Sequence, residues 1–190
     1  MLLVSRWDAI VLDIYGIEAE EKAFGLSTTN MLIHGDGNSN ILKANLFDSE
    51  DFIRKANPDI ILMNPPYNAS KNQVPKTFAS TWGKSSTDPS KGLFFVKFVA
   101  DNVKQGKLLT LLPMQCAIKT DGIIGDIKQS LLEENTLDAV FSFPIDMFYP
   151  GASAVACCMV FDLGKPHPKD YETFFGYYRE DGFEKRKGVG

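Results

Sequence analysis

The feature that most constrains this chain is a short apolar run that two prolines stop. Residues 59–64 favour a strand and lead directly into Pro65, Pro66 and Tyr67. The run has no polar alternation, which is typical of a buried strand in a parallel sheet. Proline cannot donate to a strand ladder, so we expect the sheet to end at Asn64 and a rigid loop to begin there. Functional groups of α/β proteins gather at this end of parallel strands.

Strand and helix patterns alternate along the rest of the chain. The other predicted strands are residues 8–15, 39–46, 107–113, 137–143 and 152–163, and the predicted helices are residues 19–33, 49–56 (capped by Asp48), 93–106 and 121–134. Such alternation requires a parallel sheet with right-handed crossovers. The last two strands are joined by a loop too short for a parallel crossover. We therefore predict an α/β fold with a mostly parallel sheet and an antiparallel last strand.

Two stretches do not fit this alternation. Residues 68–91 are rich in Ser, Thr, Lys and Pro, and we expect a mobile, substrate-facing loop there. The tail, residues 164–190, turns polar and basic, and we expect it to leave the domain as an extension. The chain is thus predicted to hold one domain over residues 1–190, with its core at residues 8–163.

Composition excludes several classes of protein. A chain of 190 residues with 44% hydrophobic and 23% charged residues is typical of a globular domain, and no apolar run could span a bilayer. The net charge of −4 argues against non-specific polyanion binding by this segment alone. The three cysteines, two of them adjacent, indicate a reduced cytoplasmic protein without disulfides. His34 and His167 lie far apart, and we assign no metal ligand.

Several stretches resemble one family of enzymes. Asn64-Pro65-Pro66-Tyr67 resembles the catalytic motif of amino-methyltransferases, and residues 14–18 resemble the acidic strand end that holds the ribose of S-adenosylmethionine. Residues 29–37, 143–150 and 177–183 are similar to modification (M) subunits of type I restriction-modification systems, which are N6-adenine DNA methyltransferases. The resemblance implies a Rossmann-like S-adenosylmethionine-dependent fold. It also implies DNA, a specificity subunit and a restriction subunit as partners.

The resemblance also implies roles for individual residues in catalysis. The Asn64 side-chain oxygen and the Pro65 carbonyl, held rigid by the prolines, would accept the two N–H bonds of an adenine amino group. Tyr67 would stack on a flipped base, with Phe148 or Tyr149 on its other side. The residues assigned to catalysis and base contact are therefore Asn64, Pro65, Pro66, Tyr67, Phe148 and Tyr149.

A second group of residues would bind the cofactor. Glu18 would accept hydrogen bonds from the ribose hydroxyls, as the acidic residue of dinucleotide folds does. Asn45 stands where the family carries an Asp that binds the adenine amino group of the cofactor. Phe94 is assigned to the pocket wall, whereas Phe95 is interpreted as core.

The sequence departs from the family at its start. Only seven residues precede the first predicted strand, and they contain neither the family's first strand nor its glycine-rich cofactor loop. We therefore expect a fragment of the catalytic domain that, alone, neither binds S-adenosylmethionine tightly nor methylates DNA. The missing strand would be central, so the gap must be filled by rearrangement, by a partner chain or by self-association.

Two other functions remain open at this stage. Protein-glutamine and RNA-guanine methyltransferases use the same Asn-Pro-Pro chemistry. An assay that compares DNA with peptide substrates would separate this function from DNA methylation. The chain could also be a non-catalytic remnant that retains the fold, which cofactor titration would reveal.

Overall fold

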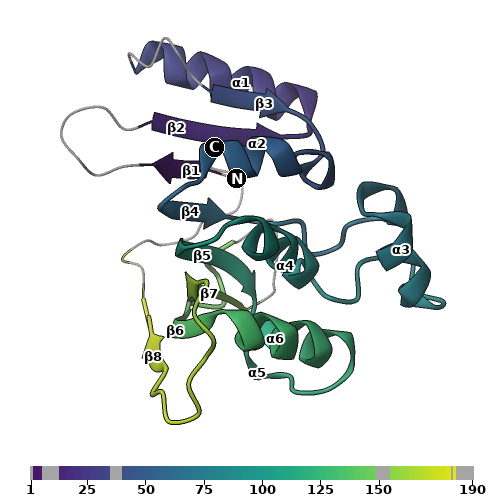
Figure 1. The fold of residues 1–190 in the computed structure, drawn as a ribbon, viewed down its shortest axis with the longest axis vertical. Coiled ribbons are helices and arrows are strands. Elements are labelled where there is room, and N and C mark those ends of the chain that lie inside the picture. The colour runs from purple at the N-terminus through teal and green to yellow at the C-terminus, as the bar shows by residue number, and fades with distance from the viewer. Residues whose placement is uncertain (1, 6–12, 35–39, 149–154, 181, 183–190) are drawn as a thin grey trace.

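One mixed sheet organises the chain. The computed structural model describes residues 2–5, 13–34, 40–148, 155–180 and 182. The strands of the sheet lie in the order β3 (Asn40–Lys43), β2 (Asp13–Glu18), β1 (Leu2–Ser5), β4 (Ile60–Met63), β5 (Gly106–Pro113), β7 (Ala156–Leu163), β6 (Thr136–Ser142) and β8 (Phe174–Tyr177) (Figure 1). Of the first predicted strand, residues 8–12 lie outside the described residues.

Most strands run in one direction, and this confirms the predicted fold class. β2 pairs with β3, β4 with β5, and β6 with β8, each in parallel. β7 is antiparallel to both β5 and β6, as predicted from the short connection that precedes it. The sheet therefore presents the carboxyl ends of β2, β3, β4, β5 and β6 along one edge.

The centre of the sheet differs from the prediction. β1 lies between β2 and β4 and is antiparallel to both, and in Figure 1 its arrow points against that of β2. Leu2 stands opposite Gly16 on one side and Leu62 on the other. The expected gap is thus filled by rearrangement within the chain, which pairs the facing edges of β2 and β4. A parallel first strand is not present in the described part of the chain.

Four longer helices match the predicted ones to within a few residues. They are α1 (Glu21–Ile33), α2 (Glu50–Ala56), α4 (Leu93–Asn102) and α6 (Gly122–Glu134), and the short α5 (Gln115–Ile118) was not predicted. The Glu20 carboxylate accepts from the backbone N–H of Ala23 and so begins α1. The predicted cap of α2 is wrong: Ser49, not Asp48, holds the N-cap position, and its hydroxyl donates to the Asn45 carbonyl.

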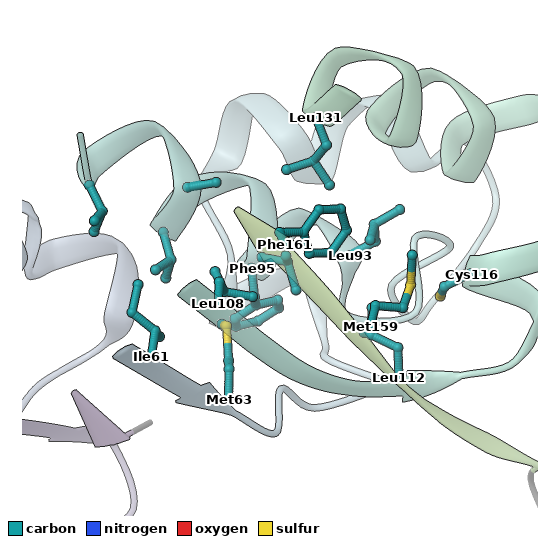
Figure 2. Close-up of a cluster of buried hydrophobic side chains, with 14 of the residues drawn as sticks. Ile61, Met63, Leu93, Phe95, Leu108, Leu112, Cys116, Leu131, Met159 and Phe161 are labelled. Carbon is teal, nitrogen blue, oxygen red and sulfur yellow. The ribbon is translucent and has the colours of Figure 1, made fainter. Parts of the chain in front are cut away.

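The hydrophobic core lies between the sheet and the helices α4 and α6. Figure 2 shows Leu131 of α6 and Leu93 of α4 approaching Phe161 of β7 and Leu108 of β5. All of these side chains are fully buried. The core is therefore built from alternate positions of the strands, as the pleat requires.

β4 is less enclosed than its apolar sequence suggested. Ile61 and Met63 are buried on the helix-covered face (Figure 2), but Leu62 points to the other face and is 42% exposed. A depression on that second face is lined by Leu62, Leu109, Leu111 and Cys158 together with the end of β4. In the described structure the strand is thus buried on one face only.

The polar stretch before α4 is not an irregular loop. It folds into η2 (Lys71–Gln73), α3 (Lys76–Ala79) and η3 (Ser80–Trp82). Figure 1 labels α3 of this segment, on the side of the molecule where α4 lies. Phe78 and Trp82 are buried, and the ring of Phe78 stacks on Phe94 with centroids 3.6 Å apart. The stretch is therefore folded and packed instead of being an irregular loop, because several of its apolar side chains are buried. Its mobility in the absence of DNA stays a prediction.

Part of the tail stays on the sheet instead of leaving it. β8 pairs with β6 as an edge strand, and the Thr173 hydroxyl donates to the Leu137 carbonyl over 2.9 Å. The basic residues 185–187 lie outside the described residues.

No helix in the described part of the chain is long and apolar enough to cross a membrane.

Burial in this core sets a test of the fold. Leu131 is fully buried on α6, whereas Leu32 on α1 is 68% exposed. We expect Leu131→Ala to lower the free energy of unfolding by about 2–5 kcal/mol, because it removes packed atoms and leaves a cavity. Leu32→Ala is the matched control and should change stability by less than about 0.5 kcal/mol. Equal effects of the two substitutions in denaturant unfolding would contradict this packing.

Candidate active site

A cavity opens at the sheet edge where β2 and β4 end. Its volume is about 520 Å³, within the range of small-molecule sites. It brings together Glu18, Asn45 and Asn64, which the sequence analysis assigned to the cofactor and to catalysis. Its lining consists of Ile17, Glu18, Ala19, Glu20, Ala44, Asn45, Leu46, Met63, Asn64, Pro65, Pro66, Tyr67, Gln73 and Phe95.

The motif residues are part of the lining of this cavity. β4 ends at Met63, so Asn64 is the first residue past the ladder and is exposed, whereas Pro65 behind it is buried. The Tyr67 hydroxyl donates to Asn64 Oδ1 over 3.4 Å, a long contact that leaves this oxygen free to accept a shorter bond. The two prolines thus place an amide at the open end of the strand.

Tyr67 stays uncharged in this setting. Burial raises the pKa of its phenol above the ordinary value. Burial likewise raises the pKa of Cys116 and Cys157 to about 12, so both thiols remain protonated. All three cysteines are free, as the sequence predicted. Tyr67, Cys116 and Cys157 are therefore all uncharged near neutral pH.

Glu18 and Glu20 supply the charge of the cavity. The Glu18 carboxylate accepts from the backbone N–H of Glu20 over 2.9 Å, and this bond holds it at the end of β2. Glu20 was not predicted as a site residue. Both are acidic, so the cavity favours ligands that bring hydroxyl or ammonium donors.

Asn45 lines the cavity and also forms two side-chain hydrogen bonds within the protein. Its Oδ1 accepts from the Phe47 backbone N–H over 3.0 Å, and its Nδ2 donates to the Gln73 carbonyl over 3.3 Å. These bonds fix the turn after β3 and tie it to η2. An amide oxygen has two lone pairs, so Asn45 Oδ1 can still accept from a ligand.

The phenylalanine of the wall is Phe95 instead of Phe94. Phe95 lines the cavity, whereas Phe94 lies between Phe78 and Phe47 and is not part of the lining. The two neighbours point in different directions on α4, and the sequence alone did not show which one faces the cavity.

The aromatic loop after β6 is only partly described. Phe148 is half-buried on this loop, at the same sheet edge as the motif, but it does not line the cavity. Tyr149 lies outside the described residues. Their assignment as base contacts therefore stays a prediction.

Gln73 is a cavity residue that sequence reasoning missed. It closes a capping box with Ser70, since the Gln73 side chain accepts from the Ser70 backbone N–H over 2.8 Å. The Ser-x-x-Gln spacing is a known helix-start signal and could have revealed η2 inside the presumed loop.

No group of three or more His, Cys, Asp or Glu side chains suited to a metal ion occurs in the described residues.

Known proteins are similar in sequence to this chain over most of its length. Type II restriction enzyme and methyltransferase RM.BcgI of Heyndrickxia coagulans is 29% identical over 182 residues, which cover 93% of this chain and 26% of the relative. The type I restriction enzyme EcoEI methylase subunit of Escherichia coli is 26% identical over 160 residues, or 80% of this chain and 31% of that subunit. The chain thus spans roughly a quarter to a third of these curated relatives.

Solved structures share its fold. The type I restriction-modification methyltransferase subunit of Streptococcus thermophilus superposes with a TM-score of 0.60 at 24% identity, over 80% of this chain and 34% of that one. In addition, residues 5–188 match the family described as N-6 DNA Methylase. That match takes in nearly the whole sequence, and the chain therefore belongs to the N-6 DNA Methylase family.

Proposed function

We propose that this chain supplies the catalytic edge of an S-adenosylmethionine-dependent DNA adenine-N6 methyltransferase in a restriction-modification system. The observation that carries the proposal is that Asn64, Pro65, Pro66 and Tyr67 line a cavity that Glu18 also lines. Membership of the family supports DNA over protein or RNA as the substrate.

The motif suits an amine that is a weak nucleophile. The lone pair of an adenine amino group is delocalised into the ring, so methylation needs that nitrogen to become sp³-like. Asn64 Oδ1 and the Pro65 carbonyl would each accept one N–H bond and favour this geometry. Their contribution is preorganised electrostatic stabilisation, without a strong base. Tyr67, neutral and half-buried, offers its ring to stack on a flipped base.

The cavity fits the adenosine part of the cofactor. When bound, S-adenosylmethionine supplies an electrophilic methyl group. Glu18 would hold the ribose hydroxyls, Asn45 the adenine edge, and Phe95 would pack against the base. Among the described lining residues the charged ones are Glu18 and Glu20, so none of these described residues offers the cofactor's carboxylate a cationic side chain. This agrees with the expectation, still a prediction, that the chain alone binds the cofactor weakly.

The surroundings of the chain in the cell are part of the proposal. Its relatives are several times longer, so we propose that catalysis requires further polypeptide and that DNA, a specificity subunit and a restriction subunit are partners. We place the assembly in the cytoplasm, where three free cysteines would remain reduced.

Asn64 provides the main test of the proposal. We expect the protein, purified from its native cells with its bound subunits, to transfer a labelled methyl group to adenine N6 in DNA. Asn64→Ala should lower this rate by on the order of 10²–10³, because one preorganised acceptor is lost. Asn102→Ala, at the far end of α4, is the matched control. A rate within about tenfold of the wild type for Asn64→Ala would refute the role of Asn64.

Glu18 provides an independent test on cofactor binding. Glu18→Gln keeps an oxygen that can accept from the Glu20 N–H but removes the charge that strengthens bonds to ribose hydroxyls. We expect calorimetry with S-adenosylhomocysteine on the same assembly to show affinity weakened about tenfold. Glu134→Gln, exposed at the end of α6, controls for net charge. Equal affinities of the two variants would remove Glu18 from the cofactor site.

A further inference from the structure

In the segment between β4 and α4, the first residues after the proposed catalytic motif form hydrogen bonds with the last residues before α4. The Asp88 backbone N–H donates to the Ala69 carbonyl over 2.8 Å, and Ser70 forms a bridge with Thr87. Lys91 Nζ donates to Asn68 Oδ1 over 2.9 Å. These contacts join residues 68–70 to residues 87–91, and we call this pair of stretches of the chain the neck of the segment. The neck begins one residue after Tyr67.

A buried carboxylate organises this neck. The side chain of Asp88 is fully buried, and it is not part of the cavity lining. Its Oδ1 accepts from the Ser90 N–H over 2.8 Å and from the Ser90 hydroxyl over 2.7 Å, while its Oδ2 accepts from the Gly92 N–H over 2.9 Å. A buried charge is costly unless it is satisfied in this way. Asp88 thus holds the backbone of residues 90–92 in one conformation.

Gly92 is the residue at which this backbone segment comes close to the motif. Its φ of +91° is one that L side chains rarely adopt, and a Cβ placed there would lie 2.9 Å from Pro65 Cγ and 3.3 Å from Pro65 Cβ. Only glycine allows both this backbone shape and this close approach. The backbone at Gly92 is consequently the seat on which the Pro65 ring rests.

We propose that Asp88 and Gly92 are positioning residues for the Asn64-Pro65-Pro66-Tyr67 motif. Asp88 shapes the seat, Gly92 contacts Pro65, and the seated ring fixes the direction of the Pro65 carbonyl and of the adjoining Asn64 amide. The catalytic meaning of this inference rests on the proposed function, whereas the seat itself is a matter of geometry. Because acceptors act only when held in place, a small displacement of the ring should reduce turnover.

The chain offers a matched glycine that separates positioning from plain stability. Gly83 lies in the same segment with a φ of +56°, and a Cβ there would meet nothing within 4 Å. Gly83→Ala and Gly92→Ala therefore both introduce a strained backbone, but only the second places a methyl group against Pro65. A merely structural role would make the two variants alike.

Fluorine NMR of the fluorotyrosine-labelled full chain reads out the motif directly. The Tyr67 resonance is assigned by its loss in Tyr67→Phe. We expect Gly92→Ala to shift or broaden this resonance and Gly83→Ala to leave it unchanged. A Tyr67 resonance that is the same in both folded variants would overturn the proposal.

Asp88 gives a second route if Gly92→Ala fails to fold. Asp88→Asn replaces one acceptor with an NH₂ group facing a backbone N–H, whereas Asp101→Asn makes the same change at an exposed site on α4. We expect only Asp88→Asn to move the Tyr67 resonance, and an unmoved resonance would overturn the proposal.

Kinetics of the native assembly then test the catalytic meaning. In Asp88→Asn, kcat should fall roughly tenfold or more while KM for cofactor stays within about twofold. Unchanged kcat would refute positioning. A wild-type assembly that methylates no DNA would instead refute the proposed function, and the NMR result would still decide whether the seat exists.

Discussion

The missing N–H groups of two consecutive prolines are the constraint on which the site depends. Because Pro65 and Pro66 cannot extend the ladder, β4 stops at Met63 and Asn64 stands at the open edge of the sheet. The parallel direction of β2, β3 and β4 brings their carboxyl ends to that same edge, and with them Glu18 and the turn of Asn45. A strand terminator and the proposed catalytic motif are thus one feature of the sequence.

The sheet tolerates an unusual centre without losing this edge. β1 runs against its neighbours, yet it pairs with both of them, so the backbones of β2 and β4 remain satisfied. The helices α4 and α6 enclose one face, while Leu62 on the opposite face is 42% exposed. The cavity, by contrast, is lined by residues from the ends of β2 and β4 and from the turns after them.

Periodicity and turn chemistry predicted most of the architecture, and contacts distant in sequence account for the rest. The alternation of strands and helices and the direction of β7 follow from local patterns and loop length. The packing of residues 68–91 depends on Phe78 meeting Phe94, and the pocket wall depends on which way Phe95 turns, neither of which has a local signal. Pairing of β1 in reverse likewise depends on the edges available to it, because a short apolar run fits either direction. In the site, the positions of Glu18 and Asn64 were predictable because each ends a strand.

An experimental structure of the native assembly with S-adenosylhomocysteine tests the central claim most directly. We expect the ligand in the cavity at the ends of β2 and β4, with its ribose hydroxyls within hydrogen-bond distance of the Glu18 carboxylate and its sulfur facing the Asn64 amide. A ligand bound elsewhere, or one whose ribose lies away from Glu18, would contradict the claim.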